Sequence, residues 1–181
     1  MDGTLLIALI VGGTALLSWP LGRYLKWAMD PADGGPRRQA LERLFDRIAG
    51  PPGRHQQKWK QYAIALLVCN AVLFVVSFAF LALQQHLPLN PDGKGPVEGS
   101  LIFNTVASFT SNTNLQHYSG EVTMSYLSQL FALMWLQFVS AATGIAALAA
   151  MARGLAGRPL GNFVLDRQRA TVLVLLPLAL V

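Results

Sequence analysis

Apolar residues in this chain occur in three long blocks, which run over residues 4–24, 61–83 and 122–152. An α-helix rises about 1.5 Å per residue, and the hydrocarbon core of a bilayer is about 30 Å thick. Each block is therefore long enough to form a membrane-spanning helix. A fourth apolar stretch begins near Ala170 and stops at Val181, which is too short to span. We therefore expect the sequence to be a fragment of a longer protein.

A polar stretch from Lys26 to Lys60 separates the first two blocks, and proline and glycine gather near residues 33–36 and 50–53. Between them, apolar side chains of residues 37–49 (RRQALERLFDRIA) recur at helical spacing, with charged residues on the other face. This pattern predicts an amphipathic helix. Such a helix can lie on the inner leaflet of the membrane or on the underside of the protein, and the sequence leaves both positions open.

A short apolar segment and a polar run lie between the second and third blocks. Residues 100–109 predict a helix with Ser100 as its N-cap, and ten residues cover about half of the hydrocarbon core. The polar run from Thr110 to Gln116 follows, and its side chains are mostly hydroxyls and amides without charge. Polar backbone at membrane depth is tolerated only where it is buried in protein or lines a water-filled cavity. The pattern therefore predicts a pore loop.

The composition is typical of an all-α integral membrane protein. Hydrophobic residues make up 53% of the 181 residues and charged residues only 13%. The apolar residues form continuous blocks, whereas the strands of a membrane β-barrel alternate between apolar and polar positions. Cys69 is the single cysteine, which excludes a disulfide within the chain.

The basic residues indicate which side of the membrane each loop occupies. Nine of the fourteen lie between the first and second spans, four follow the third span, and only Lys94 precedes the half-helix. By the positive-inside rule both basic loops are cytoplasmic, so the N-terminus and the polar run face the other side. Because the basic residues flank spans and lack a nucleic-acid-binding motif, we do not expect nucleic acid as a partner.

These observations divide the chain into five segments. An extra N-terminal membrane helix (residues 1–25) is followed by a cytoplasmic linker with the amphipathic helix (26–60). A helix–pore loop–helix unit covers residues 61–152, with its half-helix at 100–109 and its filter at 110–116. A second cytoplasmic linker (153–169) leads to a truncated helix that starts a second repeat (170–181).

The polar run suits a monovalent cation. A half-helix that enters from outside points its C-terminal end towards mid-membrane, where its partial negative charge favours a cation. Backbone carbonyls can replace the hydration shell of the ion, and Asn112 and Asn114 tolerate the positive φ that such a loop needs. Residues 110–116 include no acidic side chain, which favours carbonyl ligands over a carboxylate cage for calcium or magnesium. Glu121 either raises the local cation concentration or is an ordinary acid at a helix N-terminus.

Six motifs together resemble one known family. They are FNTVASFTSNTNLQHYSGE (103–121), LPLNPDG (87–93), WKQYA (59–63), SYLSQ (125–129), FVSAATGIA (138–146) and LGNF (160–163). With these motifs the chain resembles the N-terminal third of the potassium-binding, channel-like A subunit of the bacterial Kdp potassium pump, in the superfamily of K⁺ transporters. The NTN…Q.YSGE core is the specific part, and the resemblance extends over essentially the whole chain.

The resemblance implies an architecture and a set of functional residues. In this family, four helix–pore loop–helix units of one chain surround a pore after one extra N-terminal span. The implied first filter strand consists of Thr110, Ser111, Asn112, Thr113 and Asn114, with K⁺ bound at Ser111, Asn112 and Thr113. The implied support of the filter and its mouth consists of Gln116, Gly120 and Glu121.

The expected function is to bind and select K⁺ from the extracytoplasmic side, as the channel-like subunit of an ATP-driven uptake pump. The resemblance implies an ATP-hydrolysing B subunit, small C and F subunits, surrounding lipid and a bacterial inner membrane. K⁺ is the transported ion, and no organic cofactor is expected. The sequence lacks the DKTG motif of P-type ATPases, so the energy is expected to come from another polypeptide.

Two alternatives remain open. A homotetrameric or Trk- or Ktr-like K⁺ channel is also built from span–loop–span units, and it would conduct K⁺ passively. A membrane scaffold that transports nothing is the second alternative. In a scaffold, Gln116→Arg and Asn112→Ala would leave K⁺-limited growth unchanged.

Overall fold

The computed structural model describes residues 3–30, 35–50 and 55–180, and every regular element within these ranges is helical. The proline- and glycine-rich ends expected around the amphipathic helix lie largely outside them. Three helical segments are long and apolar enough to cross a membrane, namely α1 (Gly3–Met29), α3 (Trp59–Ala82) and the run Ser128–Leu155, which ends with α6 (Trp135–Leu155). The chain is therefore an all-α, multi-pass membrane protein, which confirms the fold class expected from the apolar blocks.

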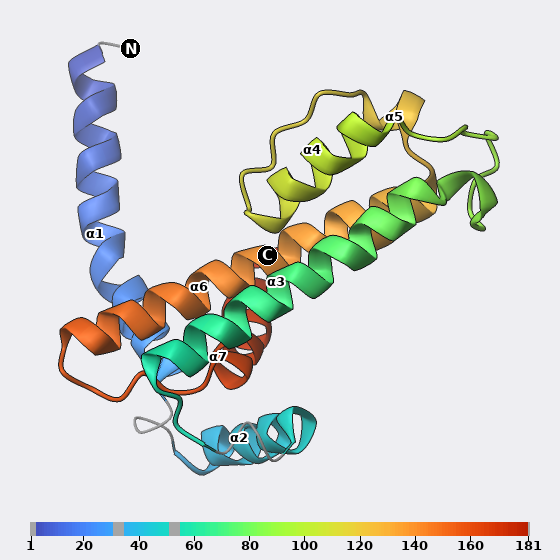
Figure 1. The fold of residues 1–181 in the computed structure, drawn as a ribbon. Helices are drawn as coiled ribbons and strands as arrows, with labels where there is room; N and C mark the ends of the chain where they lie inside the picture. Colours follow the sequence, from blue (N-terminus) through green and yellow to red (C-terminus); the bar gives the residue numbers. More distant parts are fainter. Residues whose placement is uncertain (1–2, 31–34, 51–54, 181) are drawn as a thin grey trace.

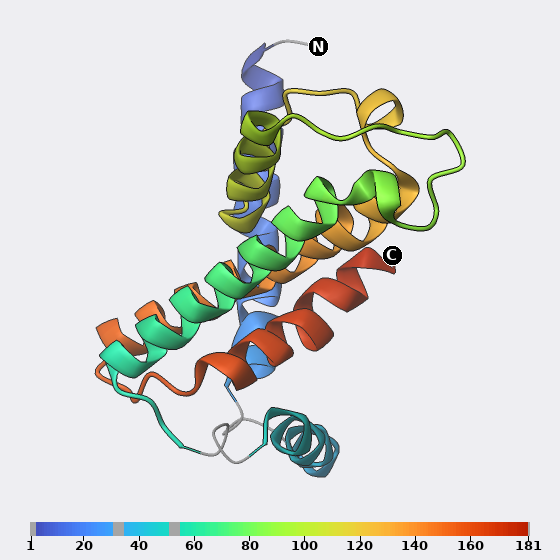
Figure 2. The same ribbon diagram turned by 45° about the vertical axis from the view of Figure 1, so that its right-hand side comes forward.

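α3 and α6 lie side by side in opposite directions and form the centre of the fold (Figure 1 and Figure 2). A shorter helix, α4 (Gly99–Thr110), packs against one half of this pair. Its Val106 and Phe109 are buried in a cluster with Leu81 of α3 and Leu136 of α6. Lipid tails are as apolar as these side chains, so close van der Waals packing, and not transfer from water, holds α4 against the two long helices.

α1 stands away from the other helices for most of its length (Figure 1). No residue in its apolar window is buried, and burial begins only at Ala28 and Met29 near its C-terminal end. The Tyr24 hydroxyl also donates a hydrogen bond to the carbonyl oxygen of Leu173 in the C-terminal helical run. The apolar surface of α1 is thus open to lipid or to further protein.

The amphipathic helix expected at residues 37–49 is confirmed as α2 (Pro36–Ala49). Phe45 is 2% exposed and packs against the end of α1 and against α7, so α2 lies on the underside of the protein. Leu44 and Ile48, on another side of α2, stay exposed. α2 runs across the view in Figure 1 and is seen nearly end-on in Figure 2, so its axis is roughly perpendicular to that of α1.

The third apolar block is interrupted near its start. It begins with the short α5 (Gly120–Thr123), breaks at Met124 and Ser125, and continues through the π-helical turns of η4 (Ser128–Met134) into α6.

Gln84 stabilises this interruption. It is fully buried in the turn η3 (Gln84–His86) after α3. Its Nε2 donates to the carbonyl oxygen of Thr123 at 3.0 Å, and its Oε1 accepts from the N–H of Ser125 at 3.2 Å. Hydrophobicity alone does not reveal the break, because the side chain that bonds to the backbone N–H and C=O groups at the break comes from a distant part of the chain.

The C-terminal helical run begins earlier than its apolar pattern predicted. It consists of α7 (Phe163–Arg169), η5 (Ala170–Leu175) and α8 (Leu176–Ala179), which follow one another without a break. The Asn162 side chain accepts hydrogen bonds from the N–H groups of Val164 and Leu165 and so caps α7. The linker expected over residues 153–169 therefore ends in a helix. The first residue of this helix is determined by the Asn162 cap and not by hydrophobicity.

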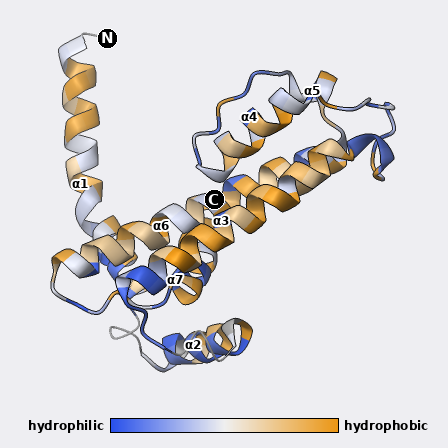
Figure 3. Cartoon of the chain, in the orientation of Figure 1, coloured by the Kyte–Doolittle hydropathy of each residue, from blue (hydrophilic) through white to orange (hydrophobic). Residues whose placement is uncertain are grey.

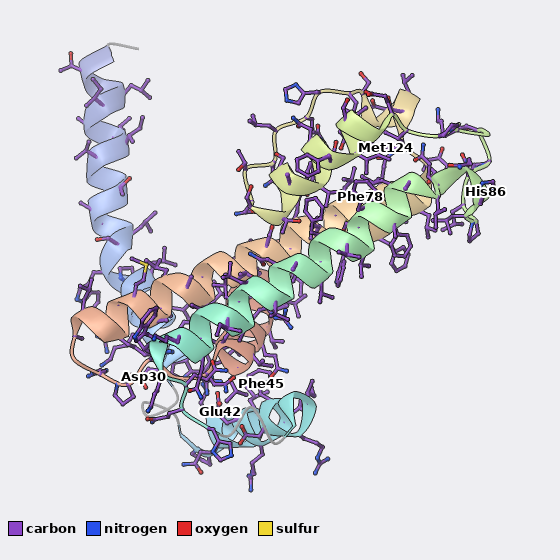
Figure 4. The ribbon with its side chains drawn as sticks, viewed as in Figure 1. Asp30, Glu42, Phe45, Phe78, His86 and Met124 are labelled. Carbon is purple, nitrogen blue, oxygen red and sulfur yellow. The ribbon has the colours of Figure 1, made fainter. Side chains whose placement is uncertain are left out.

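Hydrophilic residues gather at the two ends of the helical bundle, and the surfaces of α1, α3 and α6 between them are mostly hydrophobic (Figure 3). Asp30, Glu42 and Phe45 lie at one end, while Phe78, His86 and Met124 lie towards the other (Figure 4). This distribution fits a bundle whose middle section faces lipid or other apolar surface.

Candidate ion-binding loop

α4 brings the polar run to the middle of the α3–α6 pair. The helix begins at Gly99 with Glu98 in the N-cap position, so the expectation of Ser100 as N-cap is wrong. The Ser100 hydroxyl instead donates to the Glu98 carboxylate at 2.6 Å. α4 ends at Thr110, and an irregular loop follows until α5.

The backbone of this loop twice enters the left-handed region. The φ angle is 62° at Asn112 and 55° at Asn114. Asparagine enters this region more readily than most other residues with a side chain, because its short polar side chain can hydrogen-bond locally. Both asparagines therefore adopt the positive φ that their residue type was expected to tolerate.

Ser108, in the last turns of α4, closes the loop. Its carbonyl oxygen accepts hydrogen bonds from the N–H groups of Thr113 at 2.9 Å and Asn114 at 3.3 Å. Its hydroxyl accepts from the N–H of Leu115 at 2.7 Å. One residue thus binds three successive N–H groups, and the sequence pattern alone does not indicate this role.

Asn112 joins the loop to α6. Its Oδ1 accepts a hydrogen bond from the Ser140 hydroxyl at 3.2 Å and another from Asn114 Nδ2 at 3.3 Å. Ser140 lies twelve residues after Ser128 and fifteen before Leu155, close to the middle of this apolar run. The loop is therefore level with the middle of the third candidate span.

The carbonyl oxygens of the loop are available as ligands. Among the described residues, no hydrogen bond reaches the carbonyl oxygens of Ser111, Asn112 or Thr113. The Ser111 and Thr113 hydroxyls lie 2.9 Å apart on the same turn, and these residues are exposed in this chain. The Thr110 hydroxyl is buried and has no hydrogen-bond partner among the described residues. The loop thus presents several uncharged oxygens.

The expected mouth residues follow the filter segment Thr110–Asn114 along the chain. Gln116 and Glu121 are exposed, and Glu121 is in the first turn of α5. The Gly120 carbonyl accepts from Gln129 Nε2 at 3.2 Å, which ties α5 to the start of the third span. Burial raises the pKa of the nearby Tyr118 hydroxyl. Within the described part of the chain, no group of three or more His, Cys, Asp or Glu side chains could hold a metal ion.

A second polar cluster lies at the opposite end of the bundle, around Asp166. The Asp166 carboxylate is fully buried and receives hydrogen bonds from Arg153 at 2.7 Å and Arg169 at 3.0 Å. The Tyr62 hydroxyl donates to the same carboxylate at 3.2 Å. Side chains of α3, α6 and α7 therefore meet at one buried charge.

The cluster extends to α2 and to the end of α1 through Glu42. Glu42 accepts from Arg169 Nε at 3.0 Å and forms an ion pair with Arg38 at 2.7 Å. Arg38 also donates to the Ala28 carbonyl at 2.6 Å. Burial lowers the pKa of Arg38, and Glu42 opposes this change. Burial also acts to lower the pKa of Arg169, but Glu42 and Asp166 outweigh it and the pKa is raised.

Comparison with known proteins identifies the family. Residues 7–181 match the family described as the potassium-transporting ATPase A subunit. The chain belongs to this family. It is 46% identical to the potassium-transporting ATPase potassium-binding subunit of Mesorhizobium japonicum, 44% identical to that of Granulibacter bethesdensis and 41% identical to that of Caldanaerobacter subterraneus subsp. tengcongensis.

These similarities cover nearly all of this chain but only part of each relative. The matches include 100%, 100% and 97% of this chain, and 33%, 33% and 31% of the three relatives. The chain thus spans about a third of the length of the curated relatives it matches. Ser108, Ser140 and Asp166 are the residues that the structure adds to those expected from the family resemblance.

Proposed function

We propose that this chain forms part of a K⁺-translocating membrane subunit and carries one of its filter segments, Thr110–Asn114. The main support is the left-handed backbone at Asn112 and Asn114, held level with the middle of the run Ser128–Leu155 while nearby carbonyl oxygens stay unbonded among the described residues. The relatives are named potassium-binding subunits, which supports K⁺ as the transported ion.

Selection of K⁺ would come from replacing its water shell by uncharged oxygens. The carbonyl oxygens of Ser111, Asn112 and Thr113 are the proposed ligands, and nearby hydroxyls can add to them. The C-terminal end of α4 carries partial negative charge and favours a cation beside Thr110. Because no acidic side chain lies in the loop, the site suits a monovalent ion better than calcium or magnesium.

The proposed mouth lies on the extracytoplasmic side. By the positive-inside rule, the basic ends of α1 and α6 face the cytoplasm, so α4 enters from outside. Exposed Glu121 would concentrate cations near the entrance, and Gln116 and Gly120 would support the loop.

The complete subunit is proposed to hold four helix–pore loop–helix units around one pore, of which residues 61–152 form the first. The relatives are about three times as long as this chain, which leaves room for further units. Their name as ATPase subunits supports assembly with other subunits of the ATPase. Following the family resemblance, we propose that these are an ATP-hydrolysing B subunit and small C and F subunits in a bacterial inner membrane. In that complex this subunit would select K⁺ and pass it through the membrane.

Substitutions at Asn112 test the filter proposal in the full-length subunit within its complex. Glycine adopts positive φ without strain, whereas alanine pays roughly 1–2 kcal/mol in this conformation. We expect Asn112→Gly to keep K⁺-stimulated ATP hydrolysis near the wild-type K⁺ dependence. Asn112→Ala should raise the K⁺ concentration for half-maximal activity by about tenfold.

Ser140→Ala is the matched control, because it removes the hydrogen bond to Asn112 and leaves the backbone of the loop unchanged. Its effect should be smaller than that of Asn112→Ala. If glycine and alanine at position 112 both behave like the wild type, the loop does not select the ion and the scaffold alternative gains support.

A further inference from the structure

An apolar groove with a charged mouth lies between the C-terminal ends of α1 and α6. It encloses about 350 Å³, and its walls include Leu25 and Met29 of α1 and Ile145, Leu148 and Ala152 of α6. Above this groove, α1 stands away from the bundle (Figure 1).

The charged residues of the groove all lie at one end. Lys26 and Asp30 come from the end of α1, and Arg158 follows α6. Arg158 contacts Asp30 through Nη1 at 3.1 Å, and its side chain is 58% exposed. A guanidinium has five N–H donors, so Arg158 can bind an anion while it contacts Asp30. Arg153 also reaches the groove, but Asp166 compensates its charge.

We propose that this groove binds an anionic phospholipid, with an acyl chain between α1 and α6 and the headgroup phosphate at Lys26 and Arg158. The apolar walls lie on two membrane-spanning helices, while the basic mouth lies at the end where the arginines of α2 also gather. Basic side chains at this position attract anionic headgroups. An apolar protein helix could pack against the walls of the groove, but it would offer no anion to the basic residues at the mouth of the groove. This inference goes beyond the proposed potassium filter and is independent of it.

The test uses the full-length subunit purified with its co-purifying subunits in mild detergent. Native mass spectrometry counts the phosphatidylglycerol molecules retained, in comparison with phosphatidylcholine. Removing one basic residue near an anionic headgroup weakens binding by about fivefold. We therefore expect Lys26→Gln and Arg158→Gln each to lower phosphatidylglycerol retention, while Arg43→Gln, on exposed α2 surface away from the groove, serves as the control.

A steric variant separates lipid from protein as the occupant. Ala152 is exposed in the groove, so Ala152→Phe fills it without overpacking the core. We expect this variant to assemble normally and to retain fewer phosphatidylglycerol molecules. Three outcomes would overturn the proposal: unchanged retention in the charge variants, equal retention of phosphatidylcholine, or an Ala152→Phe subunit that no longer assembles because a protein helix fills the groove.

Discussion

Two asparagines and one serine determine the shape of the proposed filter loop. Asn112 and Asn114 have positive φ, which few other side chains tolerate. The contribution of Ser108 has a different origin. Its hydroxyl meets the N–H of Leu115 only because the intervening loop has already turned back on itself. A preference for left-handed backbone depends on one residue type, whereas a hydrogen bond across a loop depends on the path of the chain.

Ser108→Ala tests whether this closure matters for ion selection. The substitution removes the hydrogen bond from Leu115 and leaves the carbonyl oxygen that binds Thr113 and Asn114. The loss costs about 1 kcal/mol, and alanine is a better helix former than serine. We therefore expect a folded protein whose discrimination between K⁺ and Na⁺ falls several-fold in ion-stimulated ATP hydrolysis.

Ser100→Ala controls for a change of hydroxyl in the same helix, because among the described residues the Ser100 side chain bonds only to Glu98. It should leave ion discrimination unchanged. Wild-type discrimination in Ser108→Ala would show that the closure of the loop by this hydroxyl is dispensable.

At the scale of elements, hydrophobic blocks located the long helices but not their interruptions. The third block was expected to run continuously from residue 122, yet the chain breaks at Met124 and Ser125. The buried Gln84 side chain forms hydrogen bonds with the backbone groups of Thr123 and Ser125 at this break. An interruption inside an apolar segment is tolerated only where other parts of the protein or water satisfy its polar groups, so the segment itself does not reveal it.

The substitution Gly144→Ala tests whether α6 bends at this position during transport. α6 is helical through this position, and a Cβ added there meets no atom of the described residues within 4 Å. Alanine stabilises a helix interior by about 1 kcal/mol relative to glycine. We expect Gly144→Ala to raise the thermal unfolding temperature of the complex without lowering K⁺ transport. Normal folding with lost transport would instead show that glycine is needed as a hinge in α6.

At the scale of the whole molecule, the basic residues do more than indicate orientation. Arg153 and Arg169 belong to the second basic cluster of the sequence, yet they contact buried Asp166. Through Glu42 and Arg38 the same cluster reaches α2 and the end of α1. Charge counting places all these arginines on one side of the membrane, but only their packing distinguishes exposed residues from those that join helices.

Asp166→Asn tests the contribution of this cluster to stability. The variant keeps the size of the side chain but leaves Arg153 and Arg169 without their shared anion. Breaking a buried ion pair by removing one partner costs about 3–5 kcal/mol. We expect a clearly lower thermal unfolding temperature of the purified complex, with Asp92→Asn in an exposed loop as the control. Equal unfolding temperatures for the two variants would contradict a stabilising role for Asp166.

The proposed orientation is open to a direct test in intact cells. In a full-length subunit whose native cysteines, Cys69 included, are replaced by serine, single cysteines replace Asp92 in the loop before α4 or Arg43 on α2. A membrane-impermeant maleimide should label the Asp92→Cys protein in intact cells and the Arg43→Cys protein only after permeabilisation. The reverse pattern would place the polar loop on the cytoplasmic side and contradict entry of K⁺ from outside.

The sequence by itself determined the membrane class, the approximate helices, the polar run and the residues able to adopt left-handed backbone. These depend on transfer of side chains from water and on local conformational preference, which act over a few neighbouring residues. Only the tertiary structure decided that Ser140 meets Asn112, that Gln84 satisfies the break before α6, and that Asp166 gathers arginines from two helices. Such contacts join residues far apart in the chain, and they exist only once the helices have packed.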